Sequence, residues 1–225
     1  MDTFRTEEEQ VEALRKWWDD NGRSTLFAIV MAIAAGFGWQ GWQQYQQQQA
    51  EEASIRYEAL QEATQQVDEE EQRATIRHLA EGLKSDYSGS TYAQFASLHL
   101  ARLNVLEGDL VAAERELRDV LTASPAAAVR ILAELRLARV VAASGDPTVA
   151  LEILDAAEAG AYAPAYAEAR GDMYVQMDQT DMAVAAYEDA AALAAASGTG
   201  ASQSLQFKLQ ALTPIPAREV APLEE

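Results

Sequence analysis

The chain has 225 residues, a net charge of −19 at pH 7 and no cysteine. So acidic a surface argues against binding to nucleic acid or to an anionic membrane surface, because both carry the same sign of charge. Without cysteine the chain can form no disulfide, thiolate nucleophile or cysteine metal site.

Residues 1–23 are predicted to form a short amphipathic leader helix. Thr6, followed three residues later by Glu9, has the pattern of a capping box. Apolar side chains then recur on one helical face, at Val11, Leu14 and Trp18. We expect the pair Asn21–Gly22 to end this helix and to turn the chain toward a membrane.

Residues 24–45 are predicted to cross a membrane. No charged residue stands between Arg23 and Glu51, and residues 26–39 are wholly apolar. Trp18 and Trp42 would lie about 36 Å apart along a helix, close to the separation of the two interfaces of a bilayer. A cleaved signal peptide, a buried core helix and an interfacial helix are alternatives that we consider weaker.

The distribution of basic residues predicts the orientation of this helix. Arg15, Lys16 and Arg23 come shortly before the apolar run, whereas the first base after it is Arg56. Since basic residues stay on the cytoplasmic side, we expect a cytoplasmic N-terminus and an exported C-terminal domain.

Residues 46–92 are predicted to form a stalk and a degenerate first helical pair. Six glutamines between residues 43 and 49 are expected to continue the membrane helix outward as a stalk. The apolar positions that follow have helical spacing and form two groups. These groups are Ile55, Leu60, Ala63 and Val67 in the first helix, and Ile76, Leu79 and Leu83 in the second.

Residues 93–197 contain an internal repeat. Turn residues recur at Gly108, Gly145 and Asp178, which lie 37 and 33 residues apart. The spacing resembles the 34-residue tetratricopeptide repeat, in which stacked helix–turn–helix units form a solenoid. Small residues expected at close helix crossings are Ala101, Ala138, Gly171, Ala113, Ala150 and Ala183; larger ones expected around them are Leu100, Leu137, Leu117, Leu154 and Tyr187.

The predicted fold is therefore all-α, with a single N-terminal transmembrane helix followed by a tetratricopeptide-repeat-like α-solenoid. A generic helical bundle is the alternative, but the coincidence of turns, small residues and spacing favours repeats. Residues 198–212 are expected to form a closing helix, and residues 213–225, which contain three prolines, a disordered tail.

No catalytic motif is found, so we expect a binding scaffold and no enzyme. His99 has no histidine or acid one helical turn later, and His78 has only Glu81; two ligands do not make a metal site, so we expect no metal and no cofactor. A repeat solenoid binds through the concave face made by the first helices of its units. Equivalent positions there are predicted to line one groove: Leu98, Arg102, Leu135, Arg139, Glu168 and Asp172. Alternatively, the two arginines could form salt bridges within the acidic domain.

The segment 9–23, Glu-Gln-Val-Glu-Ala-Leu-Arg-Lys-Trp-Trp-Asp-Asp-Asn-Gly-Arg, resembles the leader of the YfgM-like family, the ancillary subunit of the SecYEG translocon. The exit of the apolar run, Gly38-Trp39-Gln40-Gly41-Trp42, is similar to that of the family. The segment 92–101 also resembles its first well-formed repeat helix.

This resemblance implies an inner-membrane protein whose C-terminal domain faces the periplasm. Its implied partners are the SecYEG translocon, a periplasmic chaperone of the prolyl-isomerase-like type and newly exported client proteins, which it would help to pass from the channel to folding factors. A membrane-anchored regulator, acting through the leader, and an assembly factor for an envelope complex are the alternatives.

Overall fold

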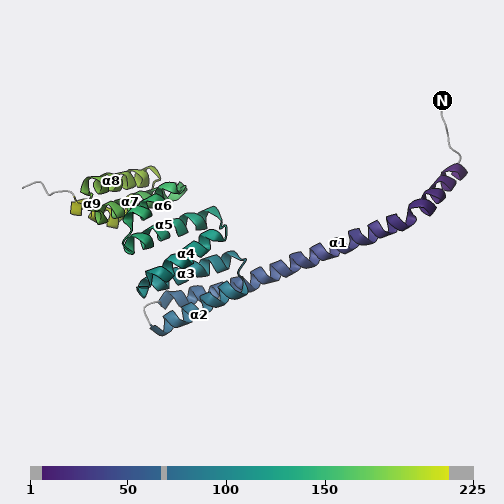
Figure 1. Ribbon diagram of the computed structural model, residues 1–225, viewed down its shortest axis with the longest axis horizontal. Helices are drawn as coiled ribbons and strands as arrows, with labels where there is room; N and C mark the ends of the chain where they lie inside the picture. Colours follow the sequence, from purple (N-terminus) through teal and green to yellow (C-terminus); the bar gives the residue numbers. More distant parts are fainter. Residues whose placement is uncertain (1–6, 67–69, 213–225) are drawn as a thin grey trace, which may run out of the picture. The chain divides into compact units, whose positions relative to one another are not determined.

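The computed structural model describes residues 7–66 and 70–212, and every regular element within them is a helix (Figure 1). The capping box predicted at Thr6 and the tail predicted for residues 213–225 lie outside the described residues. The chain divides into two units, residues 1–52 and 53–225. The first helix, α1 (Glu7–Ala63), contributes to both units.

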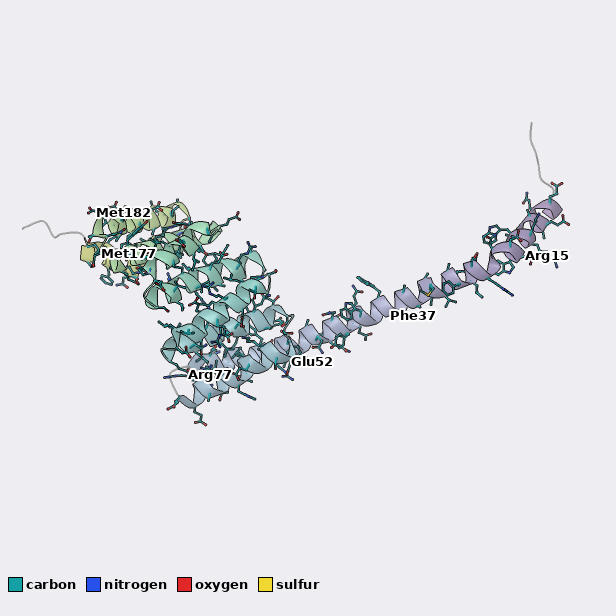
Figure 2. The ribbon with its side chains drawn as sticks, in the orientation of Figure 1. Arg15, Phe37, Glu52, Arg77, Met177 and Met182 are labelled. Carbon is teal, nitrogen blue, oxygen red and sulfur yellow. The ribbon has the colours of Figure 1, made fainter. Side chains whose placement is uncertain are left out.

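In the first unit, α1 is the one described helix that is long and apolar enough to cross a membrane, and its apolar stretch is not buried in the protein. Phe37, labelled on this stretch in Figure 2, is 71% exposed. Aromatic pairs stand on either side of the apolar run: Trp17 with Trp18 (ring centroids 6.4 Å apart) and Trp42 with Tyr45 (6.3 Å). Such pairs suit the two interfaces of a bilayer.

The prediction that Asn21–Gly22 ends the leader helix is wrong, because α1 continues through both residues. The Asn21 side-chain amide donates to the carbonyl oxygen of Trp17 at 3.1 Å, and the Ser24 hydroxyl donates to the carbonyl of Asn21 at 2.8 Å. Gly22 is covered by the indole of Trp18. The polar groups expected to form a turn are therefore satisfied within the helix.

The second unit begins with the end of α1 and continues as a stack of helices (Figure 1). Its elements are η1 (Thr64–Gln66), α2 (Glu70–Asp86), α3 (Thr91–Leu106), α4 (Leu110–Thr122), α5 (Ala127–Ala143), α6 (Pro147–Ala156), η2 (Gly160–Tyr162), α7 (Ala163–Gln176), α8 (Thr180–Ala196) and α9 (Gln203–Leu212). From α2 onward, each α-helix packs against the next, and α7 also packs against α5.

The turns of the three predicted repeats are confirmed. Gly108, Gly145 and Asp178 have φ angles of +81°, +106° and +58°, and each joins the two helices of one pair: α3–α4, α5–α6 or α7–α8. Glycine adopts this left-handed conformation without strain, whereas aspartate adopts it at a cost. Helix starts are fixed locally: the Asp109 carboxylate, for example, accepts a hydrogen bond from the amide of Ala112 at 2.9 Å.

The small and the larger packing residues predicted for the three repeats are buried as expected. Gly171 gives the clearest reason for a small residue, since an added Cβ would collide with the ring of Tyr187.

The ends of the stack are closed in different ways. Leu60 of α1 packs with α2 and α3 at one end, and Leu205 of α9 packs with α7 and α8 at the other. The fold is therefore all-α, with one candidate membrane helix and a repeat-like solenoid.

Candidate binding groove

The first helices of the three repeats, α3, α5 and α7, carry the residues predicted to line a groove. In each helix the two predicted positions are four residues apart and so share one face. This region contains several cavities. Two of them lie between α3 and α5 and have two lining residues in common. We call them the aromatic cavity and the apolar cavity.

The aromatic cavity has a volume of about 380 Å³. Tyr57, near the end of α1, stands at its edge, with ring centroids 5.4 Å from both Tyr92 and Phe95 and 6.1 Å from His99. The hydroxyl of Tyr92 donates to the Ser54 hydroxyl at 3.2 Å and so joins α3 to α1. The lining residues are Tyr57, Phe95, Leu98, His99, Arg102, Ala128, Val129, Leu132, Arg136 and Tyr162.

The apolar cavity has a volume of about 310 Å³ and lies among α3, α4 and α5. Aliphatic side chains form most of its wall. Val105 and Leu106, which line it, are 42% and 53% exposed, so part of its apolar wall is open to solvent. The lining residues are Ala101, Arg102, Val105, Leu106, Leu110, Leu117, Arg136, Arg139, Val140 and Ala143.

Three arginines, Arg102, Arg136 and Arg139, form a cluster at these cavities. Arg102 and Arg136 line both of them, and Arg139 lines the apolar cavity. Several other cations of the second unit pair with acids; Arg77, for example, meets Glu107 at 2.6 Å. Within the described residues no ion pair joins any of the three to an acid. The arginine cluster is therefore a patch of uncompensated positive charge in a strongly acidic protein.

The electrostatics of two neighbouring groups reflect this cluster. Burial, followed by the positive charges of Arg102 and Arg139, lowers the pKa of Arg136. Burial, followed by the charges of Arg136 and Arg102, also lowers the pKa of His99, which favours a neutral imidazole near pH 7. An anion in the groove would relieve both effects, because it would stabilise the charged forms.

The third repeat differs, because its two predicted acids are already paired. Lys208 of α9 donates to Glu168 at 2.8 Å and to Asp172 at 2.6 Å. These two carboxylates raise the pKa of Lys208 although burial, the largest single influence, lowers it. The Tyr187 hydroxyl also donates to Asp172 at 2.7 Å. Here α9 supplies the countercharge that the arginine cluster lacks.

The predicted groove residues therefore occupy different environments. Leu98, Arg102 and Arg139 line the two cavities, and Asp172 lines a third cavity that also includes Arg139 and Lys208. Leu135 is 4% exposed and, like Leu98 (6%), belongs to the hydrophobic core, but it lines none of these three cavities. Glu168 forms an ion pair with Lys208 and lines none of these cavities.

Sequence reasoning missed Arg136 and Tyr57. The signal for Arg136 was present, because it lies three residues before Arg139 and so one helical turn away. No such signal existed for Tyr57, because this residue belongs to α1, which lies outside the aligned repeats. In the described part of the chain, no group of three acids and histidines could hold a metal ion.

These features define an all-helical protein with one candidate membrane span and a repeat domain that has a positively charged groove. A family model described as a tetratricopeptide repeat-like domain matches residues 15–214. Three curated relatives are named ancillary SecYEG translocon subunit. The Haemophilus influenzae relative is 30% identical over 82% of this chain and 88% of its own length.

The Escherichia coli relative is 26% identical over 84% of this chain, and the Aggregatibacter actinomycetemcomitans relative is 28% identical over 82%; the match covers 88% of each of these two proteins. The chain belongs to the family of ancillary SecYEG translocon subunits. No solved structure matches it.

Proposed function

We propose that this protein is a membrane-anchored scaffold that associates with the SecYEG translocon and presents its groove to proteins emerging from the channel. The scaffold passes these newly exported proteins to periplasmic chaperones, including one of the prolyl-isomerase-like type. It acts by binding and not by catalysis. The names of the relatives support the association with the translocon.

The observation that supports a binding role most strongly is the arginine cluster beside two open cavities. A repeat domain that served only as a spacer would have no need for uncompensated charge, because like charges placed together destabilise the fold. Binding sites commonly retain such an unfavourable arrangement, since the partner supplies the missing charge. We therefore assign the groove to protein binding.

The proposed topology places residues 1–23 in the cytoplasm, residues 24–45 in the inner membrane and the repeat domain in the periplasm. Because the chain has no cysteine, single reporter cysteines can test this topology. In intact cells, a membrane-impermeant maleimide should label Ala195→Cys, an exposed position on α8 of the repeat domain, and should leave Glu9→Cys unlabelled. Both should react after the membrane is dissolved. Labelling of Glu9→Cys alone in intact cells would reverse the orientation.

The association itself is tested by affinity purification of the tagged full chain from cross-linked membranes dissolved in a mild detergent. Mass spectrometry should recover the Sec channel subunits together with a periplasmic chaperone. A tagged unrelated single-span protein serves as the control. Recovery of neither partner with a folded, membrane-embedded chain would contradict the proposal and would favour a regulator or an envelope assembly factor.

A further inference from the structure

The arginine cluster has an arrangement that restricts what the groove binds. Arg102 and Arg136 form a wall common to the aromatic and apolar cavities, so positive charge stands between two apolar sites. Arg102 and Arg139 are exposed and Arg136 is half-buried, which leaves their guanidinium groups accessible to a ligand. A ligand that fits must therefore present negative charge between two apolar groups.

We propose that the groove binds an extended peptide segment in which acidic side chains lie between two apolar side chains, one of them aromatic. The proposal deepens the proposed function, on which it rests, by naming the chemistry of the bound segment. An aromatic side chain enters the aromatic cavity and meets Tyr57 and Phe95. An aliphatic side chain enters the apolar cavity, against Val105 and Leu110. The acidic side chains between them pair with the arginine cluster.

The chemistry of the cavity walls supports a peptide over other anions. Arginine presents a planar fork of donors that matches a carboxylate in bidentate geometry. A free phosphate would use the arginines alone and leave the aliphatic and aromatic walls exposed to water. A nucleic acid would bring many charges close to a protein of net charge −19. A short acidic segment with apolar flanks satisfies the cluster and both cavities.

Pairing within this groove is stronger than on an open surface. Burial already lowers the pKa of Arg136, so this side chain is partly removed from water before any ligand arrives. An acid bound there interacts in a medium of lower effective dielectric than bulk water. The bound carboxylates also remove the repulsion within the cluster. The net charge of the whole protein, in contrast, disfavours ligands with long runs of acid.

The experiment measures binding of a fluorescein-labelled peptide, Gly-Ser-Phe-Ser-Asp-Glu-Ser-Leu-Ser-Gly, to the full chain in detergent micelles by fluorescence anisotropy. Two control peptides replace Asp-Glu by Asn-Gln, or Phe and Leu by Ser. The test variant is Arg102→Gln with Arg136→Gln and Arg139→Gln. A charge-matched variant, Arg115→Gln with Arg118→Gln and Arg130→Gln, alters arginines that line neither cavity.

We expect the test variant to lose about tenfold or more of the affinity for the acidic peptide, since hydrogen bonds to charged groups are among the strongest in proteins. The matched variant should bind like the wild type. Both control peptides should bind at least about tenfold more weakly than the acidic peptide. At about 1 M salt, where the screening length is about 3 Å, binding of the acidic peptide should weaken but should not vanish, because the apolar contacts persist.

Equal loss in the matched variant would show that overall charge and not the groove binds the peptide, and would overturn the proposal. Equal binding of the Asn-Gln peptide would overturn it as well. If the peptide binds only after deletion of residues 213–225, the occupant is the chain's own acidic tail and the assignment to a partner is wrong. Circular dichroism of each variant establishes that loss of binding is not loss of fold.

Failure of this inference is distinguishable from failure of the proposed function. Purification of the wild-type chain from cross-linked membranes tests its association with the translocon independently of peptide binding. Recovery of the Sec channel by the wild type, with no binding of the acidic peptide, would overturn the ligand assignment alone. Binding of the peptide without recovery of the channel would overturn the proposed function alone.

Discussion

Replacement of Gly171 by alanine tests the packing of the third repeat. An ideal Cβ on Gly171 would overlap two ring atoms of Tyr187 and would lie 2.9 Å from its Cζ. The ring has little room to move. It is 2% exposed, and its hydroxyl donates to Asp172 at 2.7 Å. The added methyl group must therefore displace the ring or separate α7 from α8.

The expected magnitude combines opposing effects. Overpacking a well-packed site costs about 1–3 kcal/mol, and displacement of the ring weakens a hydrogen bond to a carboxylate worth about 1.5 kcal/mol or more. Alanine returns about 1 kcal/mol because it favours a helix over glycine. We expect Gly171→Ala to destabilise the fold by about 2–3 kcal/mol. For a domain of this size this lowers the melting temperature by roughly 4–12 °C.

The assay is thermal unfolding of the full chain in mild detergent, followed by far-ultraviolet circular dichroism. Gly82→Ala is the matched control, because Gly82 is also helical and its added Cβ would meet no atom within 4 Å. This variant should be more stable than the wild type by about 0.5–1 kcal/mol. In a Tyr187→Leu background, Gly171→Ala should cost much less. An unchanged melting temperature for Gly171→Ala, or an equal loss in both backgrounds, would refute the reasoning.

Three further predictions concern charges and the turns. Asp178→Gly should stabilise the fold by about 1 kcal/mol, measured by the same thermal melt, because glycine removes the strain of a positive φ; a decrease would mean that the carboxylate is needed there. Lys208→Met should destabilise the fold by about 1–2 kcal/mol in the same melt, because it leaves two partly buried carboxylates without their cation. The control Arg118→Met, at a more exposed ion pair, should cost about 0.5 kcal/mol or less. His99 has a lowered pKa, so its contribution to stability is present above its unfolded pKa of about 6.5 and is lost as the pH falls through the folded value. Between about pH 7.5 and pH 5 the melting temperature of the wild type should therefore fall more than that of His99→Gln; parallel curves would contradict this assignment.

The turns and the small packing residues of the repeats could be predicted from the sequence. A left-handed turn needs one of few residue types, so Gly108, Gly145 and Asp178 are visible in a single chain. Ala138 and Gly171 could be placed for a related reason, since a close helix crossing admits few side chains. In both cases one local physical requirement selects the residue.

The arginine cluster could be anticipated only in part. Alignment of the repeats indicates that Arg102 and Arg139 occupy equivalent positions, but it does not show which long side chain finds an acid. That depends on contacts such as Lys208 with Glu168, which are 40 residues apart in the chain. The same limit explains why Glu168, predicted for the groove, is held by α9.

The course of α1 shows a local signal overridden by its surroundings. Asn-Gly commonly ends a helix, because both residues tolerate a left-handed conformation. Here helix-forming residues flank the pair, and α1 continues through it. The Asn21 side-chain amide donates to the carbonyl oxygen of Trp17 within the helix. Nothing at this pair requires a left-handed residue, so the termination signal is not used.

Site-specific photocross-linking in membranes active in export tests the central claim most directly. A photoreactive residue replaces Leu132, which lines the aromatic cavity, and in a separate chain it replaces Arg130, which is exposed on the same helix and lines neither cavity. We predict adducts with newly exported proteins from position 132 and few or none from position 130. Equal yields at the two positions, or none at position 132 while a model substrate is being translocated, would contradict a groove that receives exported chains.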